Sequence, residues 1–154
     1  MSRLYDIPGR PQLRLEHVLL DVNGTVTGRG SLLPEVAERI AALRETLTVL
    51  LLSADTFGTV AGLAQKLEVE YELVVSGDDK VRVLRSLGAE VSCAIGNGSN
   101  DAGMLEAAAL GIAVIGPEGL SRCALASADV VCGSILDAFD LVLDPRALAA
   151  TLRP

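Results

Sequence analysis

The chain has 154 residues and a mass of 16.0 kDa, a length that predicts one domain spanning residues 1–154 around one core. Half of the residues are hydrophobic, which excludes a disordered chain. The net charge is −7 and the 13 basic residues are scattered singly, so we expect no nucleic-acid partner. The longest stretch of low polarity, residues 107–116, is far shorter than the ~20 residues of a membrane helix. Charged residues also interrupt the first 16 positions, and we therefore expect a cytoplasmic protein with no membrane partner.

Short apolar runs alternate along the chain with segments of helical period, which is the pattern of a parallel sheet covered by helices on both faces. Residues 4–7 and 12–15 predict an N-terminal β-hairpin, within an extension over residues 1–16. The predicted strands of the sheet are residues 17–22, 47–52, 73–75, 91–95, 112–115 and 130–131. The predicted helices are residues 34–44, 56–67, 79–87, 101–109 and 134–141, with a short last helix that starts at Asp144-Pro145. This order predicts an α/β fold with a doubly wound, Rossmann-like parallel sheet.

The three cysteines and the single histidine carry no sign of a metal or disulfide site. Cys93, Cys123 and Cys132 are odd in number, lie in apolar surroundings and lack metal-ligand spacing, so we interpret them as small core residues. His17 begins the first strand of the sheet, at the end away from the expected site, and we assign it a structural role.

Polar side chains follow three of the predicted strands, where ligands bind in doubly wound folds. Asp21, Asn23 and Thr25 follow the first of these strands, Ser53 and Asp55 the second, and residues 96–101 the fourth. Lys80 opens the helix before that fourth strand. A carboxylate, a hydroxyl, an ammonium and a second carboxylate on neighbouring loops form a plausible set for phosphoryl transfer with a magnesium ion.

The order and spacing of these groups resemble the four motifs of the haloacid dehalogenase (HAD) superfamily. The segments are DVNGT, SADTFGT, a lysine and IGNGSND. Together with the ending ILDAFDLVLDPRALAATLR, they are most similar to small soluble proteins likened to the phosphorylation domain of P-type ATPases. The resemblance covers nearly the whole chain and implies a HAD core fold and a phosphohydrolase or phosphotransferase activity on a phosphorylated small molecule or protein.

The resemblance assigns a role to each matched position. Asp21 would be the nucleophile that forms an aspartyl-phosphate, and Lys80 would pair with it and with the phosphate. Thr25 and Ser53 would hydrogen-bond the phosphoryl group, helped by backbone N–H groups of the Asn23-Gly24 turn.

Magnesium would be held by Asp21, Asp101 and the main-chain carbonyl of Asn23, beside a fourth metal-associated position at Asn97. The supporting positions would be Gly24, Gly96, Gly98, Asn100 behind Asp101, and Asp55. Asp55 is equally suited to capping the next helix.

Two positions depart from the family pattern. Position 23 is normally the Asp that protonates the leaving oxygen and then activates water, whereas Asn23 cannot exchange a proton at neutral pH. Such an acid/base group contributes about 10²–10⁴ in rate, so we predict slow turnover and a preference for leaving groups that need little protonation, such as acyl and aryl phosphates. Asn97 stands where a metal-associated Asp is usual, which predicts weaker magnesium binding.

Members of this superfamily usually carry a cap domain, and this chain leaves no room for one. Thr27 is followed closely by the helix at Pro34, and one helix and one strand fill the gap between Ser53 and Lys80. We therefore expect a capless protein whose open site is covered by a macromolecular substrate or by a second subunit of a homo-oligomer. The N-terminal hairpin is a candidate contact between subunits, or it covers an edge of its own sheet.

Three other functions remain open at this point. A non-catalytic relative could keep the phosphate and magnesium site and act through a protein partner. A dehalogenase needs no acid at position 23, although retention of Asp101 argues against it. Gly96, Gly98 and Gly103 suggest a dinucleotide-binding loop, but their spacing is wrong for that motif.

Overall fold

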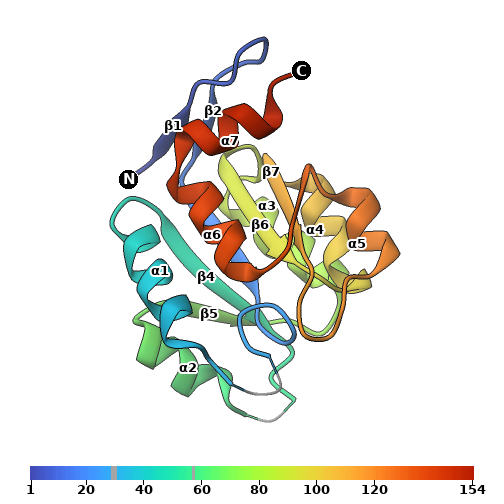
Figure 1. The fold of residues 1–154 in the computed structure, drawn as a ribbon. Coiled ribbons are helices and arrows are strands. Elements are labelled where there is room, and N and C mark those ends of the chain that lie inside the picture. The colour runs from blue at the N-terminus through green and yellow to red at the C-terminus, as the bar shows by residue number, and fades with distance from the viewer. Residues whose placement is uncertain (29–30, 57) are drawn as a thin grey trace.

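The computed structural model describes residues 1–28, 31–56 and 58–154 and confirms the α/β fold. Six parallel strands form one sheet in the order β5-β4-β3-β6-β7-β8 (Figure 1). The strands are β3 (His17–Asp21), β4 (Thr48–Ser53), β5 (Glu70–Leu73), β6 (Ser92–Gly96), β7 (Leu110–Val114) and β8 (Val130–Cys132). Strands β3, β6 and β7 are buried along almost their whole length, because helices cover both faces of the sheet.

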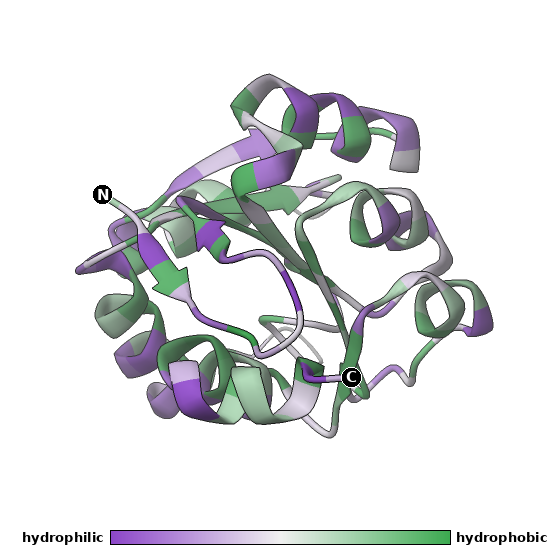
Figure 2. Ribbon diagram, turned by 90° about the horizontal axis from the view of Figure 1, so that it is seen from above, coloured by the Kyte–Doolittle hydropathy of each residue, from purple (hydrophilic) through white to green (hydrophobic). Residues whose placement is uncertain are grey.

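The helices form two layers that enclose the sheet (Figure 2). One face packs against α1 (Pro34–Arg44), α2 (Val60–Leu67), α6 (Ile135–Leu143) and α7 (Pro145–Leu152). The other face packs against α3 (Gly77–Leu87), α4 (Ala102–Ala107) and α5 (Arg122–Ser127), with the 3₁₀ turns η1 (Ala89–Val91) and η2 (Ser99–Asp101) beside them. Neighbouring strand residues serve opposite cores: Val18 and Leu20 belong to the first, Leu19 to the second.

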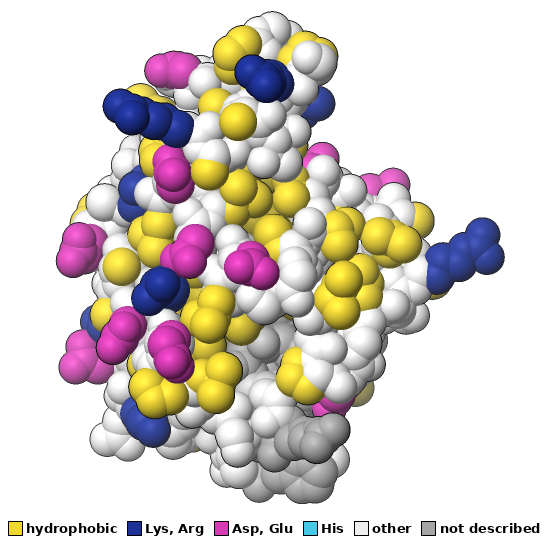
Figure 3. All heavy atoms as spheres, viewed as in Figure 1, with side chains coloured by type: hydrophobic (Ala, Val, Ile, Leu, Met, Phe, Trp, Pro, Cys, Tyr) yellow, Lys and Arg dark blue, Asp and Glu magenta, His cyan; other side chains and the backbone are white. Residues whose placement is uncertain are grey.

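The outer faces of α1 and α6 carry charged side chains (Figure 3). Acidic and basic side chains are interspersed over α1 and α6 (Figure 3), where Arg39 Nε lies 2.7 Å from Asp140 Oδ1 and joins the two helices. Such exposed pairs contribute about 1 kcal/mol or less. Among the described residues, no helix combines the length and the apolar character needed to cross a membrane.

The predicted N-terminal hairpin is confirmed as β1 (Arg3–Tyr5) paired antiparallel with β2 (Leu13–Leu15). It packs at the end of the sheet where α6 and α7 meet (Figure 1). The buried Tyr5 hydroxyl donates to the Val142 carbonyl at 2.8 Å, and Arg3 donates to the Leu143 carbonyl at 2.9 Å. Neither hairpin strand joins the six-stranded sheet, so the hairpin does not pair with either of its edge strands. A role between subunits stays a prediction.

Two predicted elements lie at shifted positions. The third strand of the sheet was predicted at residues 73–75, but β5 spans Glu70–Leu73. The error follows from composition, because β5 is an exposed edge strand whose glutamates break any apolar run. The helix predicted from residue 56 begins at Val60, because Asp55 Oδ1 accepts hydrogen bonds from the backbone N–H groups of Thr59 and Val60. Position 57 of that prediction lies outside the described residues.

Helix α5 is a helix that the sequence pattern did not predict, and it carries one of the cysteines. The short segment Arg122–Ser127 is capped by the Ser121 side chain, which accepts a hydrogen bond from Ala124 N at 3.1 Å. Cys93 and Cys132 are buried as predicted, but Cys123 is exposed on α5, so its assignment to the core is wrong.

Candidate functional site

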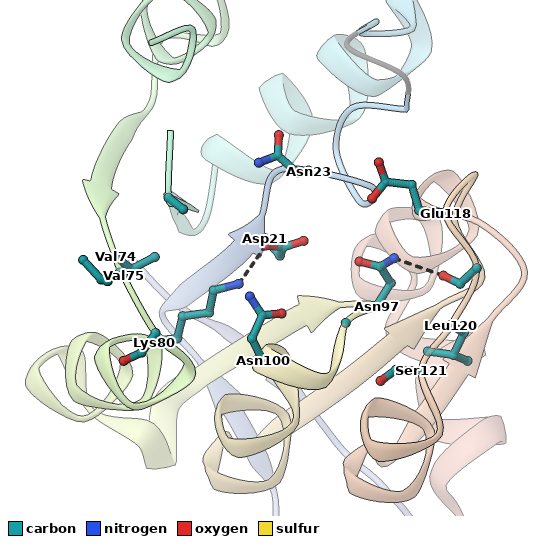
Figure 4. Close-up of a pocket in the computed structure, with 14 residues that line it drawn as sticks. Asp21, Asn23, Val74, Val75, Lys80, Asn97, Asn100, Glu118, Leu120 and Ser121 are labelled. Atoms are coloured by element: carbon teal, nitrogen blue, oxygen red, sulfur yellow. Dashed lines mark hydrogen bonds and ion pairs between the residues drawn. The ribbon is translucent and has the colours of Figure 1, made fainter. Parts of the chain in front are cut away.

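The candidate site lies where the strand order reverses. The chain runs from β3 to β4 on one side and returns to β6 on the other, so the carboxyl ends of these strands meet at one edge of the sheet. An open pocket of about 530 Å³ occupies this edge (Figure 4). Its lining comprises Asp21, Asn23, Ala54, Val74, Val75, Ser76, Lys80, Asn97, Gly98, Asn100, Glu118, Gly119, Leu120 and Ser121.

Three of the predicted residues form an ion-pair network at the base of the pocket. The Lys80 ammonium lies 2.7 Å from Asp21 Oδ1 and 2.6 Å from Asp101 Oδ1. All three residues are buried, and the Asp101 side chain is fully so. Residues that are 80 positions apart in the sequence thus share one buried cation.

Local sequence explains why Lys80 reaches this position. Ser76 and Asp79 form a capping box that fixes the start of α3, one turn before Lys80. Gly77 lies against the backbone of η2, where a β-carbon at position 77 would be 2.7 Å from the Asn100 carbonyl oxygen. The absence of a side chain at position 77 therefore lets α3 approach the loop that carries Asp101.

The loop after β6 wraps around the Asp101 carboxylate. Asp101 Oδ2 accepts hydrogen bonds from the backbone N–H groups of Asn97 at 3.0 Å and Gly98 at 2.9 Å. A β-carbon at position 96 would lie 2.5 Å from the carboxyl carbon of Asp101, so glycine is required there. This loop accordingly holds one carboxylate at a fixed place beside Lys80.

The site carries more negative than positive charge. Burial raises the pKa of the Asp21 carboxyl, and the charge of Asp101 raises it further. Lys80 and Thr25 lower it only in part, and the resulting pKa is about 6 instead of 3.8. Burial also lowers the pKa of the Lys80 ammonium, but its two carboxylate neighbours outweigh that effect and hold it above its ordinary value. Asp21 is therefore ionised at neutral pH, but its ionised form is less stable than that of an exposed carboxyl. A second cation nearby would stabilise this ionised form.

Asn97 connects the loops that surround Asp21. The Thr25 hydroxyl lies 3.0 Å from both Asp21 Oδ2 and Asn97 Oδ1. Asn97 Nδ2 donates to the Gly119 carbonyl at 3.0 Å, and the Asn97 main-chain carbonyl accepts from Ser121 N at 2.8 Å. The Asn97 amide is thus engaged on both of its polar atoms in bracing loops.

The remaining predicted residues lie at or near the pocket in different roles. Asn23 and Asn100 line it, whereas Ser53 lies buried beside it and accepts a hydrogen bond from Asp55 N at 2.9 Å. The Asp55 side chain caps the start of α2 and is not among the lining residues. The backbone N–H of Gly24 donates to the Thr27 carbonyl at 2.9 Å, and a contact of this turn with phosphate stays a prediction.

The sequence analysis did not predict two segments that line the pocket. Glu118, Leu120 and Ser121 come from the loop between β7 and α5, and Val74 and Val75 come after β5 (Figure 4). The signal for the first group was present, because Gly-Pro-Glu-Gly lies directly after the carboxyl end of a predicted strand.

No protein-family model matches the chain. An uncharacterised protein of Methanocaldococcus jannaschii is 44% identical over 78 residues, which cover 48% of this chain and 84% of that protein. SynA of Synechococcus elongatus, named as a copper-transporting ATPase, is 43% identical over 88 residues, which cover 53% of this chain and 11% of the ATPase. The chain therefore corresponds to a small part of that transporter.

Solved structures share the fold. The cobalt-bound deoxy-D-mannose-octulosonate 8-phosphate phosphatase of Haemophilus influenzae superposes with a TM-score of 0.74 at 17% identity, covering 91% of this chain and 94% of that one. A Streptomyces avermitilis protein assigned to the HAD family of hydrolases gives 0.69 at 24% identity, covering 84% and 88%. A zinc-transporting P-type ATPase gives 0.65 at 27% identity, covering 79% and 20%. The chain thus shares its fold with structures described as HAD family hydrolases and phosphatases, and part of its sequence is similar to a segment of P-type ATPases.

Proposed function

We propose that the protein is a magnesium-dependent phosphohydrolase or phosphotransferase that works through an aspartyl-phosphate on Asp21. The observation that carries the proposal is the Lys80 ammonium held between Asp21 and Asp101 at the base of an open pocket. A buried nucleophilic carboxylate beside a fixed cation is the arrangement that attack on a phosphoryl group requires. The HAD phosphatases that share the fold support the same reaction class.

The reaction would begin with attack by a carboxylate oxygen of Asp21 on phosphorus, as the bond from phosphorus to the leaving oxygen breaks. Lys80 neutralises charge on the phosphoryl oxygens and keeps Asp21 ionised. The Thr25 hydroxyl, at 3.0 Å from Asp21 Oδ2, fixes the orientation of the carboxylate. Water then attacks the aspartyl-phosphate, which returns the Asp21 carboxylate and releases inorganic phosphate.

The residues present fit a magnesium ion. Two buried carboxylates share a single ammonium, and burial together with the charge of Asp101 raises the pKa of Asp21, so a cation beside Asp21 would favour its ionised form. Asp21, Asp101 and the main-chain carbonyl of Asn23 would hold the ion through oxygen, the ligand type that magnesium prefers. When bound, magnesium supplies positive charge to the phosphoryl oxygens. Asn97 is less available as a ligand than its position suggests, because its amide braces the neighbouring loops.

The chemistry of position 23 sets the expected substrate range. Asn23 lines the pocket but offers no proton at neutral pH, so the leaving group must depart with little protonation. We therefore expect acetyl phosphate and aryl phosphates to react faster than sugar or alcohol phosphates. The pocket is open, and coverage by a macromolecular substrate or by a second copy of the chain remains part of this proposal.

The experiment is a phosphate-release assay on freshly purified protein with acetyl phosphate, p-nitrophenyl phosphate and ATP, in magnesium and in EDTA. Release that requires magnesium and is lost in Asp21→Asn supports the proposal. Asp78→Asn is the matched control, since this carboxylate lies in the first turn of α3 and does not line the pocket. Binding of magnesium or phosphate without any release would favour the alternative, a non-catalytic relative that acts through a protein partner.

A further inference from the structure

A carboxylate from an unassigned loop lies against the turn after the nucleophile. The segment between β7 and α5 contains a tight turn in which Gly119 N donates to the Gly116 carbonyl at 2.9 Å, with Pro117 and Glu118 at its centre. A β-carbon at position 24 would lie 2.5 Å from Glu118 Oε2. The Glu118 carboxylate therefore lies over the backbone one residue beyond Asn23.

The sequence permits this contact at two glycines. A side chain at position 116 would collide with the Gly24 carbonyl oxygen, so the two loops touch where both lack a β-carbon. Gly24 also has a φ of +76°, a backbone conformation that other residues rarely adopt. Glycine at both positions thus brings Glu118 to the nucleophile loop.

Asn97 holds the same turn from the other side. Its Nδ2 donates to the Gly119 carbonyl at 3.0 Å, a bond that a carboxylate at position 97 has no proton to make. The two departures from the family pattern are connected in this way: the amide at position 97 anchors the turn that brings a new carboxylate close to position 23. In Figure 4, Glu118 lies on the same side of the pocket as Asn23, with Asp21 between it and Lys80.

Glu118 has no structural task among the described residues that would explain this placement. It forms no ion pair or side-chain hydrogen bond with any of them, and it caps no helix there. It is exposed to solvent and lines the pocket, so a proton that it accepts can pass directly to bulk water.

We propose that Glu118 is the general base for hydrolysis of the aspartyl-phosphate, in the role that Asn23 cannot perform. This inference rests on the function proposed above. The oxygen of a water molecule attacks phosphorus and its proton passes to the Glu118 carboxylate, while the bond from phosphorus to the Asp21 oxygen breaks and its electron pair returns to Asp21. The products are inorganic phosphate and the free Asp21 carboxylate, and Glu118 releases its proton to solvent.

The test separates the two chemical steps. Protein is phosphorylated with acetyl phosphate in magnesium, the acetyl phosphate is removed by rapid desalting, and the phosphorylated fraction is followed by mass spectrometry after acid quenching. In Glu118→Gln we expect the phosphoenzyme to accumulate and to decay on the order of 10²-fold more slowly than in the wild type. Glu106→Gln, the same change at an exposed position of α4 outside the pocket, should decay at the wild-type rate.

A second substitution distinguishes catalysis from a structural effect. Adding Asn23→Asp to Glu118→Gln supplies a carboxylate at the usual position and should restore fast decay. If Glu118→Gln slowed decay by damaging the fold, this second substitution would not restore it. Decay of Glu118→Gln at the wild-type rate would overturn the role of Glu118 and leave the phosphoenzyme mechanism standing. Equal slowing of formation and decay would also overturn it, in favour of a role in positioning or metal binding. Absence of any phosphoenzyme in both the wild type and Glu118→Gln would refute both the proposed function and this inference.

Discussion

Replacement of Asp21, the nucleophile in the function proposed above, should stabilise the protein. Burial and the nearby Asp101 raise the pKa of Asp21 from 3.8 to about 6, so the folded state holds the Asp21 proton more tightly than the unfolded state does. The contribution of such a carboxyl to the free energy of unfolding is largest below pH 4. This contribution falls as the pH rises to about 6 and is constant above that. At 1.4 kcal/mol for each tenfold change, the loss at pH 7.5 is about 3 kcal/mol.

Asp21→Asn removes this cost while most of the hydrogen bonding can persist. Lys80 keeps its partner Asp101 at 2.6 Å. The Thr25 hydroxyl has one proton and two acceptors at 3.0 Å, Asp21 Oδ2 and Asn97 Oδ1. An amide at position 21 can donate to Thr25, which frees the Thr25 proton for Asn97. We therefore expect a gain of about 1–3 kcal/mol at pH 7.5, or about 2–4 °C in Tm for each kcal/mol.

The assay is urea unfolding of both proteins in EDTA from pH 4 to pH 8. The difference in free energy of unfolding between Asp21→Asn and the wild type should increase from pH 4 to pH 6 and remain constant above pH 6. Saturating magnesium should narrow this difference, because in the proposed site the ion binds the folded wild type through Asp21. Asp78→Asn should match the wild type throughout. If Asp21→Asn is less stable than the wild type at pH 7.5 in EDTA, the ionised carboxylate stabilises the fold through Lys80, which would contradict a pKa raised by burial and by Asp101.

Three further substitutions test other parts of the structure. Lys80→Met removes the cation from two buried carboxylates and should cost about 3–5 kcal/mol in EDTA at pH 7, measured by urea unfolding, with partial recovery in magnesium; a cost below about 1 kcal/mol would contradict the ion-pair network. Asn97→Asp loses the proton donated to Gly119 and should reduce stability in EDTA by about 1–3 kcal/mol, yet bind magnesium more tightly in titration calorimetry; unchanged affinity would show that position 97 lies outside the metal's reach. Tyr5→Phe leaves the Val142 carbonyl without its hydroxyl partner and should lower stability by about 1 kcal/mol without altering phosphate release, whereas an effect on release would contradict the separation of hairpin and site.

Much of the fold and the site could be predicted because both depend on the carboxyl ends of buried strands. The apolar runs around Leu19, Leu50 and Ile95 are fully or largely buried, so hydrophobicity alone locates these central strands. Parallel strands place the residues after their carboxyl ends at one edge of the sheet, which is why Asp21 and Asp101 could be grouped from sequence.

The features that were missed depend on contacts that hydrophobicity does not encode. Strand β5 is exposed along its length and pairs through its backbone with β4, so its residues give no apolar signal. Glu118 occupies a Gly-Pro-Glu-Gly turn, whose place after a predicted strand suggests the pocket edge but whose composition does not show which way the carboxylate points. Its proximity to Gly24 arises from the packing of two loops 94 positions apart, a contact visible only in three dimensions.

The role of Asn97 shows why a substitution cannot be interpreted by charge alone. In the sequence, Asn97 could be interpreted only as the replacement of a metal-associated Asp. In the structure it donates to Gly119 and accepts from Thr25, two bonds of opposite polarity that a carboxylate could not make together. Compared with an aspartate, Asn97 therefore lacks a negative charge but forms hydrogen bonds that connect two loops.

Phosphorylation of Asp21 can be tested directly. Wild-type protein and Asp21→Asn are incubated with acetyl phosphate in magnesium, quenched in acid, digested at low pH and mapped by tandem mass spectrometry. We expect a phosphoryl group on Asp21 in the wild type, absent in EDTA and in the variant. A phosphoryl group at another residue, or none under any of these conditions, would contradict this expectation.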